Sequence, residues 1–238
     1  MPSEVIAGAS AIWKSLPNDS IAYQTCLDLT CEVARGKYPR FIGRDDELDF
    51  LVSLLSWKGG RNALLVGPPG AGKTALVVGL AHRIVNGKCP KSLQRGRVLM
   101  TSVDDLYAVS AEATNPWARE RAVLRDLFKE VREQGHILFY DNTHLLEHYP
   151  ISSALIREEA RRGDVSILGA CQTERFYAFS QKNRPMVEMF FRVDVREPTL
   201  DTTLAILTDY VQRSASVEWG DDLSATLRTL IQMASSYI

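Results

Sequence analysis

The sequence has almost no net charge, few cysteines and no long apolar stretch, and each absence narrows what the chain can be. Its 28 lysines and arginines nearly balance 29 aspartates and glutamates, so the net charge of −1 gives no global attraction for nucleic acid or a strongly charged membrane. No apolar run approaches the ~20 residues of a membrane span. The opening residues 1–5 also lack the basic-then-apolar order of a secretory signal. We therefore expect a cytoplasmic protein without a membrane span and do not expect nucleic acid as a partner.

Cysteine and histidine provide no clear metal site. The four cysteines show no metal-like spacing: Cys26, Cys31, Cys89 and Cys171. Cys26 and Cys31 are close enough in sequence to pair, but free thiols in a reducing cytosol fit the composition better. His144 and His148 lie four residues apart, as ligands on a helix would. Without a third ligand, two surface histidines are the better interpretation.

The strongest signal is a glycine-rich stretch of the G-x-x-x-x-G-K-[ST] type, the pattern of a phosphate-binding loop. Apolar residues 63–66 before it predict a buried strand, and apolar residues at helical spacing over 76–85 predict a helix after it. Glycine tolerates positive φ, so the loop N–H groups and the helix N-terminus can face phosphates. Lys73 is then expected to reach the β- and γ-phosphates and Thr74 to ligate Mg²⁺. A glycine-rich turn that binds nothing fits poorly, because strand, loop, Lys-Thr and helix are in register. The candidate nucleotide-binding residues here are Gly67, Pro68, Pro69, Gly70, Ala71, Gly72, Lys73, Thr74 and Ala75.

Strand and helix patterns alternate along the rest of the chain. One helix is predicted to start at Pro116 with Asn115 as its cap, and Asp45 or Asp46 is expected to cap an earlier helix. Strands alternating with helices predict a parallel sheet covered on both faces. The strands after the first are expected at 98–103, 137–141, 165–169 and 191–195.

Several stretches around this core resemble the first ATPase module of the Clp-type AAA+ unfoldases and disaggregases. The resemblance covers about residues 20–238 and is carried by Phe41-Ile42-Gly43-Arg44-Asp45-Asp46-Glu47, by 29–37, by 81–99 and by Tyr237-Ile238. It implies an α/β fold, a P-loop NTPase αβα sandwich with a five-stranded parallel sheet. It also implies ATP or ADP with Mg²⁺ as cofactors, a hexameric ring, and protein substrates threaded through the ring. Phe41 and Ile42 match the positions that flank the adenine.

The resemblance divides the chain into three parts. Residues 1–37 are expected to be a helical N-terminal extension or linker, and 38–198 the large αβα nucleotide-binding subdomain. Residues 199–238 are expected to be the start of a helical lid that is truncated before its end. Asp221 or Asp222 is expected to cap the last helix of this lid.

The sequence departs from the family pattern where water is activated. Asp141 matches the Walker B aspartate, which implies that it holds Mg²⁺ through the nucleotide. The next position carries Asn142 where the family has a glutamate. An amide can hydrogen-bond a water but cannot accept its proton, and general-base help is worth ~10²–10⁴ in rate. Glu147 lies too far along the chain from Asn142 to be assigned this role, although another carboxylate acting as the base stays an alternative. Gln172 matches the polar sensor position and keeps a polar side chain.

Two further family features are altered. Glu188 and Met189 stand where the family has a pair of arginine fingers, which are worth ~10³–10⁵ in rate in well-studied phosphate chemistry. Arg184 or Arg192 could substitute if the local register shifts. Trp117 lies one position from the family's pore-loop aromatic and lacks the flanking glycines, so we favour a packing role for it.

These departures favour an ATP-binding module whose ATP hydrolysis is weak or absent, with nucleotide stabilising assembly with protein partners or other AAA+ subunits. One alternative is an active ATPase within a homo- or hetero-hexameric ring. A second is a scaffold that keeps the fold without nucleotide, which the intact Lys73 argues against. DNA handling is a weaker variant, because its basic helix faces are more often solvated surfaces: Arg119, Arg121, Arg125, Arg157, Arg161 and Arg162.

Overall fold

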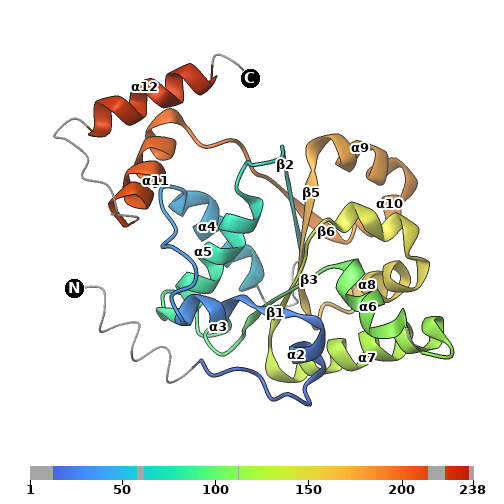
Figure 1. Ribbon diagram of the computed structural model, residues 1–238. Helices are drawn as coiled ribbons and strands as arrows, with labels where there is room; N and C mark the ends of the chain where they lie inside the picture. Colours follow the sequence, from blue (N-terminus) through green and yellow to red (C-terminus); the bar gives the residue numbers. More distant parts are fainter. Residues whose placement is uncertain (1–12, 58–61, 112, 214–222, 236–238) are drawn as a thin grey trace.

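A central sheet lies between two layers of helices in the computed structural model, which describes residues 13–57, 62–111, 113–213 and 223–235 (Figure 1). The strand order across the sheet is β1-β3-β4-β5-β2-β6. The strands are β1 (Leu27–Asp28), β2 (Asn62–Gly67), β3 (Val98–Thr101), β4 (Ile137–Tyr140), β5 (Ser166–Gln172) and β6 (Phe190–Asp194).

Five strands, β2 to β6, form the predicted parallel sheet, and their places match the apolar runs of the sequence. The prediction of five strands is nevertheless incomplete. The two-residue strand β1 adds a sixth strand and pairs antiparallel with β3, Leu27 opposite Met100 and Asp28 opposite Leu99. Two residues are too few to show the alternation by which a strand is recognised in sequence. Strand β5 also runs three residues further than expected, to Gln172, because it pairs with β2 as far as Gly67.

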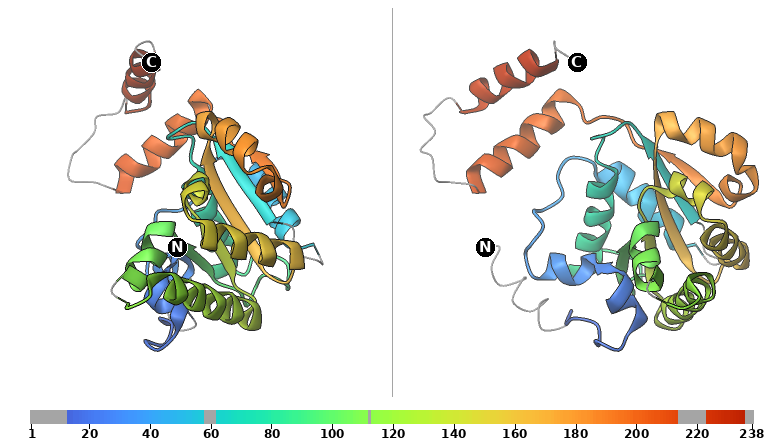
Figure 2. Two further views of the ribbon diagram at one scale, coloured as in Figure 1. Left: turned by 90° about the vertical axis from the view of Figure 1, so that its right-hand side faces the viewer. Right: turned by 45° about the vertical axis from the view of Figure 1, so that its right-hand side comes forward.

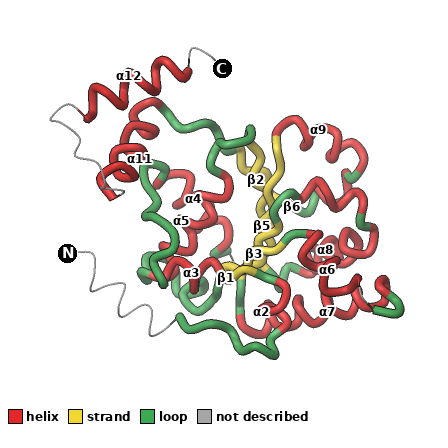
Figure 3. The backbone as a smooth tube through the Cα atoms, in the orientation of Figure 1, coloured by secondary structure: helices red, strands yellow, loops and turns green. Residues whose placement is uncertain are grey.

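Helices cover both faces of this sheet, as the alternating pattern predicts (Figure 3). Helices α3, α4 and α5 pack on one face, and α2 with α6 to α10 on the other (Figure 1). The helices are α2 (Ile21–Thr25), α3 (Leu29–Ala34), α4 (Asp45–Leu55), α5 (Lys73–Val85), α6 (Val103–Ala111), α7 (Pro116–Gln134), the 3₁₀ helix η1 (Thr143–His148), α8 (Pro150–Arg162), α9 (Thr173–Lys182), α10 (Arg184–Val187), α11 (Leu200–Arg213) and α12 (Leu223–Ser235).

Two helix starts test the capping rules. Asn115 caps α7 as predicted, and its side-chain oxygen accepts the N–H of Ala118 at 3.2 Å. The expected cap of α4 is wrong, because Arg44 occupies the cap position and makes no side-chain cap bond there. Asp45 and Asp46 lie inside the first turn, where their carboxylates interact favourably with the positive end of the helix dipole.

The N-terminal part is more integrated than the predicted extension of residues 1–37. Within 13–37 the chain forms α2, β1 and α3, and Ala22 and Leu29 are fully buried. Asp28 caps α3 through the N–H of Cys31 and forms an ion pair with Arg97. Residues 13–37 therefore belong to the sandwich, and residues 1–12 lie outside the described residues.

Helices α11 and α12 fall within residues 199–238, the segment expected to be the start of a lid, and are called the lid helices below. They pack against each other and lie to one side of the sandwich in both views of Figure 2, and α11 is joined to the segment before α4 by the Arg40–Asp209 ion pair. Arg228 of α12 pairs with Asp201 of α11 at 3.2 Å. The expected cap at Asp221 or Asp222 and the final Tyr237-Ile238 lie outside the described residues.

Candidate nucleotide-binding site

The phosphate loop joins the carboxyl end of β2 to α5, the place where open α/β sheets bind ligands. Gly70 and Gly72 have φ values of 79° and 90°, in the left-handed region that favours glycine. A side chain at Gly70 would meet nothing within 4 Å, so the loop is open on that side. Lys73 is the first residue of α5, and the helix N-terminus therefore faces the loop.

Lys73 is held against its own loop. Its Nζ donates to the carbonyl oxygens of Gly67 and Pro68, both at 2.8 Å. Burial lowers the pKa of Lys73, and the nearby Asp141 carboxylate opposes that shift. A bound phosphate would compete with the two carbonyls for this ammonium group.

Thr74 and Asp141 offer the oxygen ligands that Mg²⁺ prefers. Asp141 directly follows β4, and one of its carboxylate oxygens accepts the N–H of Asn142 at 2.9 Å. Its other oxygen and the exposed Thr74 hydroxyl have no hydrogen-bond partner among the described residues. These groups fit a metal held through the nucleotide. Across the described residues, no cluster of three His, Cys, Asp or Glu side chains could hold a metal by itself.

Asn142 has an unusual backbone. Its φ of 51° makes it the one non-glycine residue with positive φ in the described part of the chain. Asparagine tolerates this left-handed conformation better than most residues. The side chain is exposed, while Thr143 beside it is buried and its hydroxyl bonds both the Tyr140 carbonyl and the Ala170 N–H. The turn after β4 is therefore fixed from within, and the residue that faces solvent is an amide.

Gln172 ends β5 directly beside the phosphate loop, because it pairs with Gly67. The sheet thus brings the predicted sensor residue to the same edge as Lys73. Cys171 before it is buried, and burial raises the pKa of its thiol to about 11 although Lys73 opposes the shift. This thiol is therefore protonated at neutral pH.

Phe41 and Ile42, which the resemblance assigns to the adenine, border a pocket beside the phosphate loop. They line this pocket, of about 450 Å³, together with Gly70, Gly72, Thr74 and Ala75 of the phosphate loop and helix. The Phe41 ring packs on Gly79 of α5, so closely that a Cβ there would lie 2.7 Å from the ring. Residues that the sequence does not single out complete the pocket, among them Val78 of α5 and Pro198 and Ile206 on the lid side.

Glu188 and Met189 occupy the expected finger positions, and the two nearby arginines, Arg184 and Arg192, each form a surface ion pair with a carboxylate. Glu188 follows α10, where Arg184 pairs with it at 2.8 Å. Met189 packs against the core. Arg192 pairs with Asp194 on β6, and its guanidinium lies 4.6 Å from the centre of the Phe176 ring.

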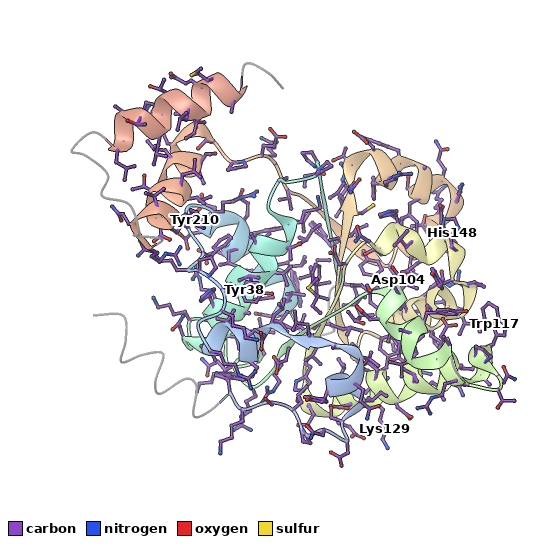
Figure 4. The ribbon with its side chains drawn as sticks, viewed as in Figure 1. Tyr38, Asp104, Trp117, Lys129, His148 and Tyr210 are labelled. Carbon is purple, nitrogen blue, oxygen red and sulfur yellow. The ribbon has the colours of Figure 1, made fainter. Side chains whose placement is uncertain are left out.

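Four other expectations need correction or comment. The packing role predicted for Trp117 is wrong, because 56% of the surface of this residue is exposed. Trp117 lies at the start of α7, on the opposite side of the view from Tyr38 (Figure 4). Of the two histidines, His148 is exposed as predicted, whereas His144 is half-buried. Glu147 pairs with Lys182 at 3.4 Å. The four cysteines are all free, so the pairing of the first two does not occur.

Arg44 is a site residue that the sequence does not distinguish. Only 7% of it is exposed, and its guanidinium donates to the carbonyl of Ala71 inside the phosphate loop. It lies in the segment that resembles the family, but composition and periodicity give no reason to bury an arginine beside a run of acidic residues. Arg44 is recognised by the burial of its charged side chain, and that burial can be seen only in the three-dimensional structure.

Comparison with known proteins assigns the family of the chain. A family model described as "AAA ATPase domain" matches residues 40–235, which is most of the chain. The chain belongs to this AAA ATPase family. The match includes the phosphate loop, the turn after β4 and both lid helices.

Curated relatives of the AAA module are Clp-type chaperones. The chain is 33% identical to chaperone protein ClpB of Vibrio vulnificus over 193 residues, covering 79% of the chain and 22% of that protein. It is 36% identical to ClpB of Rhizobium meliloti over 188 residues, covering 76% and 21%. The chain thus resembles a Clp-type AAA+ module and spans less than a quarter of the length of these two relatives.

Solved structures agree with this assignment. A Saccharomyces cerevisiae Hsp104–casein complex in an extended conformation superposes with a TM-score of 0.79 at 25% identity, covering 92% of this AAA module and 38% of that chain. An S. cerevisiae Hsp104–ADP complex gives a TM-score of 0.76 at 27% identity, with coverages of 90% and 37%. Among the described residues of the AAA module, no helix combines the length and apolar character needed to cross a bilayer.

Proposed function

We propose that this AAA+ module binds ATP with Mg²⁺ and hydrolyses it weakly or not at all. Binding is supported by Lys73, Thr74 and Asp141 at one sheet edge and by the pocket between Phe41 and the phosphate loop. The single observation that carries the weak hydrolysis is Asn142. An exposed amide in a left-handed turn stands where a base would have to accept a proton from water.

The altered finger positions support the same proposal from the other side of the phosphate. Glu188 is paired with Arg184, and a carboxylate at this position has no donor to offer the γ-phosphate of an adjoining subunit. Nucleotide would then stabilise contacts with protein partners or other AAA+ subunits, in a cytoplasmic hexamer of the Clp kind. Stabilisation by binding needs no chemistry, because any ligand that prefers the assembled state shifts the equilibrium toward it.

The test is to identify the nucleotide that stays bound. Purified protein is incubated with Mg²⁺ and ATP for hours, free nucleotide is removed, and the bound species is measured, with Lys73→Ala as the control for specific binding. Retained ATP in the wild type and none in Lys73→Ala supports the proposal. Retained ADP contradicts weak hydrolysis and favours an active ATPase in a homo- or hetero-hexameric ring.

The active-ring alternative has its own measurement. If a complete AAA+ partner supplies the missing groups, adding that partner should raise phosphate release by the mixture above the sum of the separate rates. A scaffold that binds no nucleotide would instead show no difference between the wild type and Lys73→Ala in retained nucleotide.

A further inference from the structure

Arg44 joins three separate parts of the molecule through one buried guanidinium. Nη1 donates to the carbonyl of Ala71 in the phosphate loop, and Nη2 donates to the carbonyl of Arg196 at 3.0 Å. Nε and Nη2 also contact Glu47 of α4 at 3.2 Å. Hydrogen bonds from a charged donor are roughly twice as strong as neutral ones, and the fork of the guanidinium fixes their directions.

The carbonyl of Arg196 lies in the segment that leads from β6 to the lid. Val195 donates its N–H to Val66 of β2 at 2.7 Å, and a Cβ on Gly67 would lie 2.2 Å from the Val195 carbonyl oxygen. The start of the phosphate loop is therefore packed directly on this linker. Only Glu197, Pro198 and Thr199 separate Arg196 from the first residue of α11.

The residues around Arg44 also touch the lid. Gly43 has a φ of 78°, and a Cβ there would lie 2.8 Å from the Cγ2 atom of Thr202 on α11. Arg40 pairs with the buried Asp209 of α11 at 2.7 Å. The segment from Arg40 to Arg44 thus lies between the phosphate loop and the lid helix, with polar contacts to both.

We propose that Arg44 is a positioning residue that ties the conformation of the phosphate loop to the position of the lid helix α11. Because one rigid fork holds the carbonyls of Ala71 and Arg196, a shift of the loop moves the linker, and a shift of the lid moves the loop. By linkage, the lid arrangement then sets nucleotide affinity by the same factor by which nucleotide biases the lid. This inference rests on the proposed nucleotide binding.

The experiment measures amide hydrogen exchange in the full chain with and without Mg²⁺ and the non-hydrolysable analogue AMP-PNP. In the wild type, we expect nucleotide to slow exchange both in the phosphate loop and in α11. Arg44→Met keeps a long apolar side chain but removes the donors. In this variant, saturating AMP-PNP should still slow amide exchange in the phosphate loop. The slowing of exchange in α11 should fall by about tenfold or more relative to the wild type.

Arg83→Met is the matched control. Arg83 is also anchored to α4, through Asp45 and Asp49, but touches neither the phosphate loop nor the linker. It should retain the wild-type response in α11. Arg44→Lys keeps the charge without the fork and should show an intermediate response, which preserves the test if Arg44→Met does not fold.

The outcomes separate this inference from the proposed function. If the wild type binds AMP-PNP but α11 does not respond, or if Arg44→Met responds like the wild type, the role of Arg44 is overturned while nucleotide binding stands. If the wild type binds no AMP-PNP at all, the proposed function fails and this inference fails with it.

Discussion

Two halves of one sheet edge contrast in how they are built. The binding half consists of the phosphate loop with Phe41 and Ile42, and the chemistry half of Asp141, Asn142 and Gln172. The binding half depends on backbone shape, with glycines at positive φ and a buried Ala71. The chemistry half depends on single side-chain groups at positions such as Asn142, whose side chain faces solvent.

The contrast shows that a side chain at a catalytic position can be exchanged with little change in the free energy of unfolding. A side chain at Gly67 would disturb packing against the segment after β6, and Gly70 and Gly72 hold positive φ that other residues adopt only with strain, so the fold itself favours these loop glycines. Replacing an exposed carboxylate by an amide after β4 costs little stability, because Thr143 and not Asn142 holds that turn. Four predictions would break or sharpen this comparison.

The largest effect is expected from returning a carboxylate to the chemistry half. Asn142→Asp and Asn142→Glu should each raise the single-turnover rate of ATP hydrolysis, by up to ~10²–10⁴. The two variants differ in strain, because glutamate at positive φ costs about 1–2 kcal/mol that aspartate largely avoids. Phosphate release and thermal unfolding measure both effects. Equal rates in the wild type and both variants would mean that another group already activates the water.

The next effect concerns the anchor of the binding half. Lys73→Ala removes a cation that donates to phosphate oxygens, so the Kd for ATP should rise by about 10- to 100-fold, as for a lost charged hydrogen bond. Titration with a fluorescent nucleotide measures it. Lys182→Ala, which removes an exposed lysine paired with Glu147, is the control and should bind as the wild type does. Unchanged affinity in Lys73→Ala would place the nucleotide elsewhere.

Two glycines compare the halves by packing alone. A Cβ at Gly67 would meet the Val195 backbone oxygen at 2.2 Å, whereas one at Gly169 would meet side-chain atoms of Thr143 and Leu64 at 2.6 and 2.8 Å. Gly67→Ala should therefore lose more free energy of unfolding than Gly169→Ala, within a range of about 1–3 kcal/mol for overpacking. Urea denaturation of both variants gives the difference. A larger loss in Gly169→Ala would reverse the claim that the fold protects the binding half more strongly.

The smallest effect is a pH dependence far from either half. Burial lowers the pKa of His136 below the ordinary histidine value of 6.5, and Arg97 adds to the shift while Asp28 and Glu130 oppose it. The unfolded chain takes up a proton as pH falls through 6.5 and the folded chain does so only lower, so stability should fall across that window.

Melting curves between about pH 5 and 8 test this pH dependence. His136→Gln keeps a side-chain acceptor for the Arg97 N–H, which His136 Nδ1 accepts at 3.2 Å, but cannot titrate. Its melting temperature should depend less on pH than that of the wild type. An equal slope in both proteins would assign the pH dependence to other groups.

Local signals in the sequence predicted most of the strands and the phosphate loop, whereas Phe41 and Ile42 were singled out only by the resemblance to Clp-type modules. Five strands are recognised by apolar runs and the phosphate loop by a fixed glycine spacing, and both are local properties of the sequence. The exposure of Trp117, the burial of Arg44 and the strand β1 are not local, because each depends on which distant segments arrive beside it. The left-handed turn at Asn142 lies between these cases, since the residue type permits it but does not require it.

The short strand β1 has a consequence for the behaviour of the chain in solution. It pairs with β3 at the border of the sheet, so it covers backbone groups that a second molecule could otherwise use to extend the sheet. Leu27 and Asp28 thus block edge-to-edge aggregation through β3. A shortened version beginning after Asp28 should keep its phosphate loop and yet precipitate more readily on storage. Any minimal version of this AAA module should therefore begin well before Leu27.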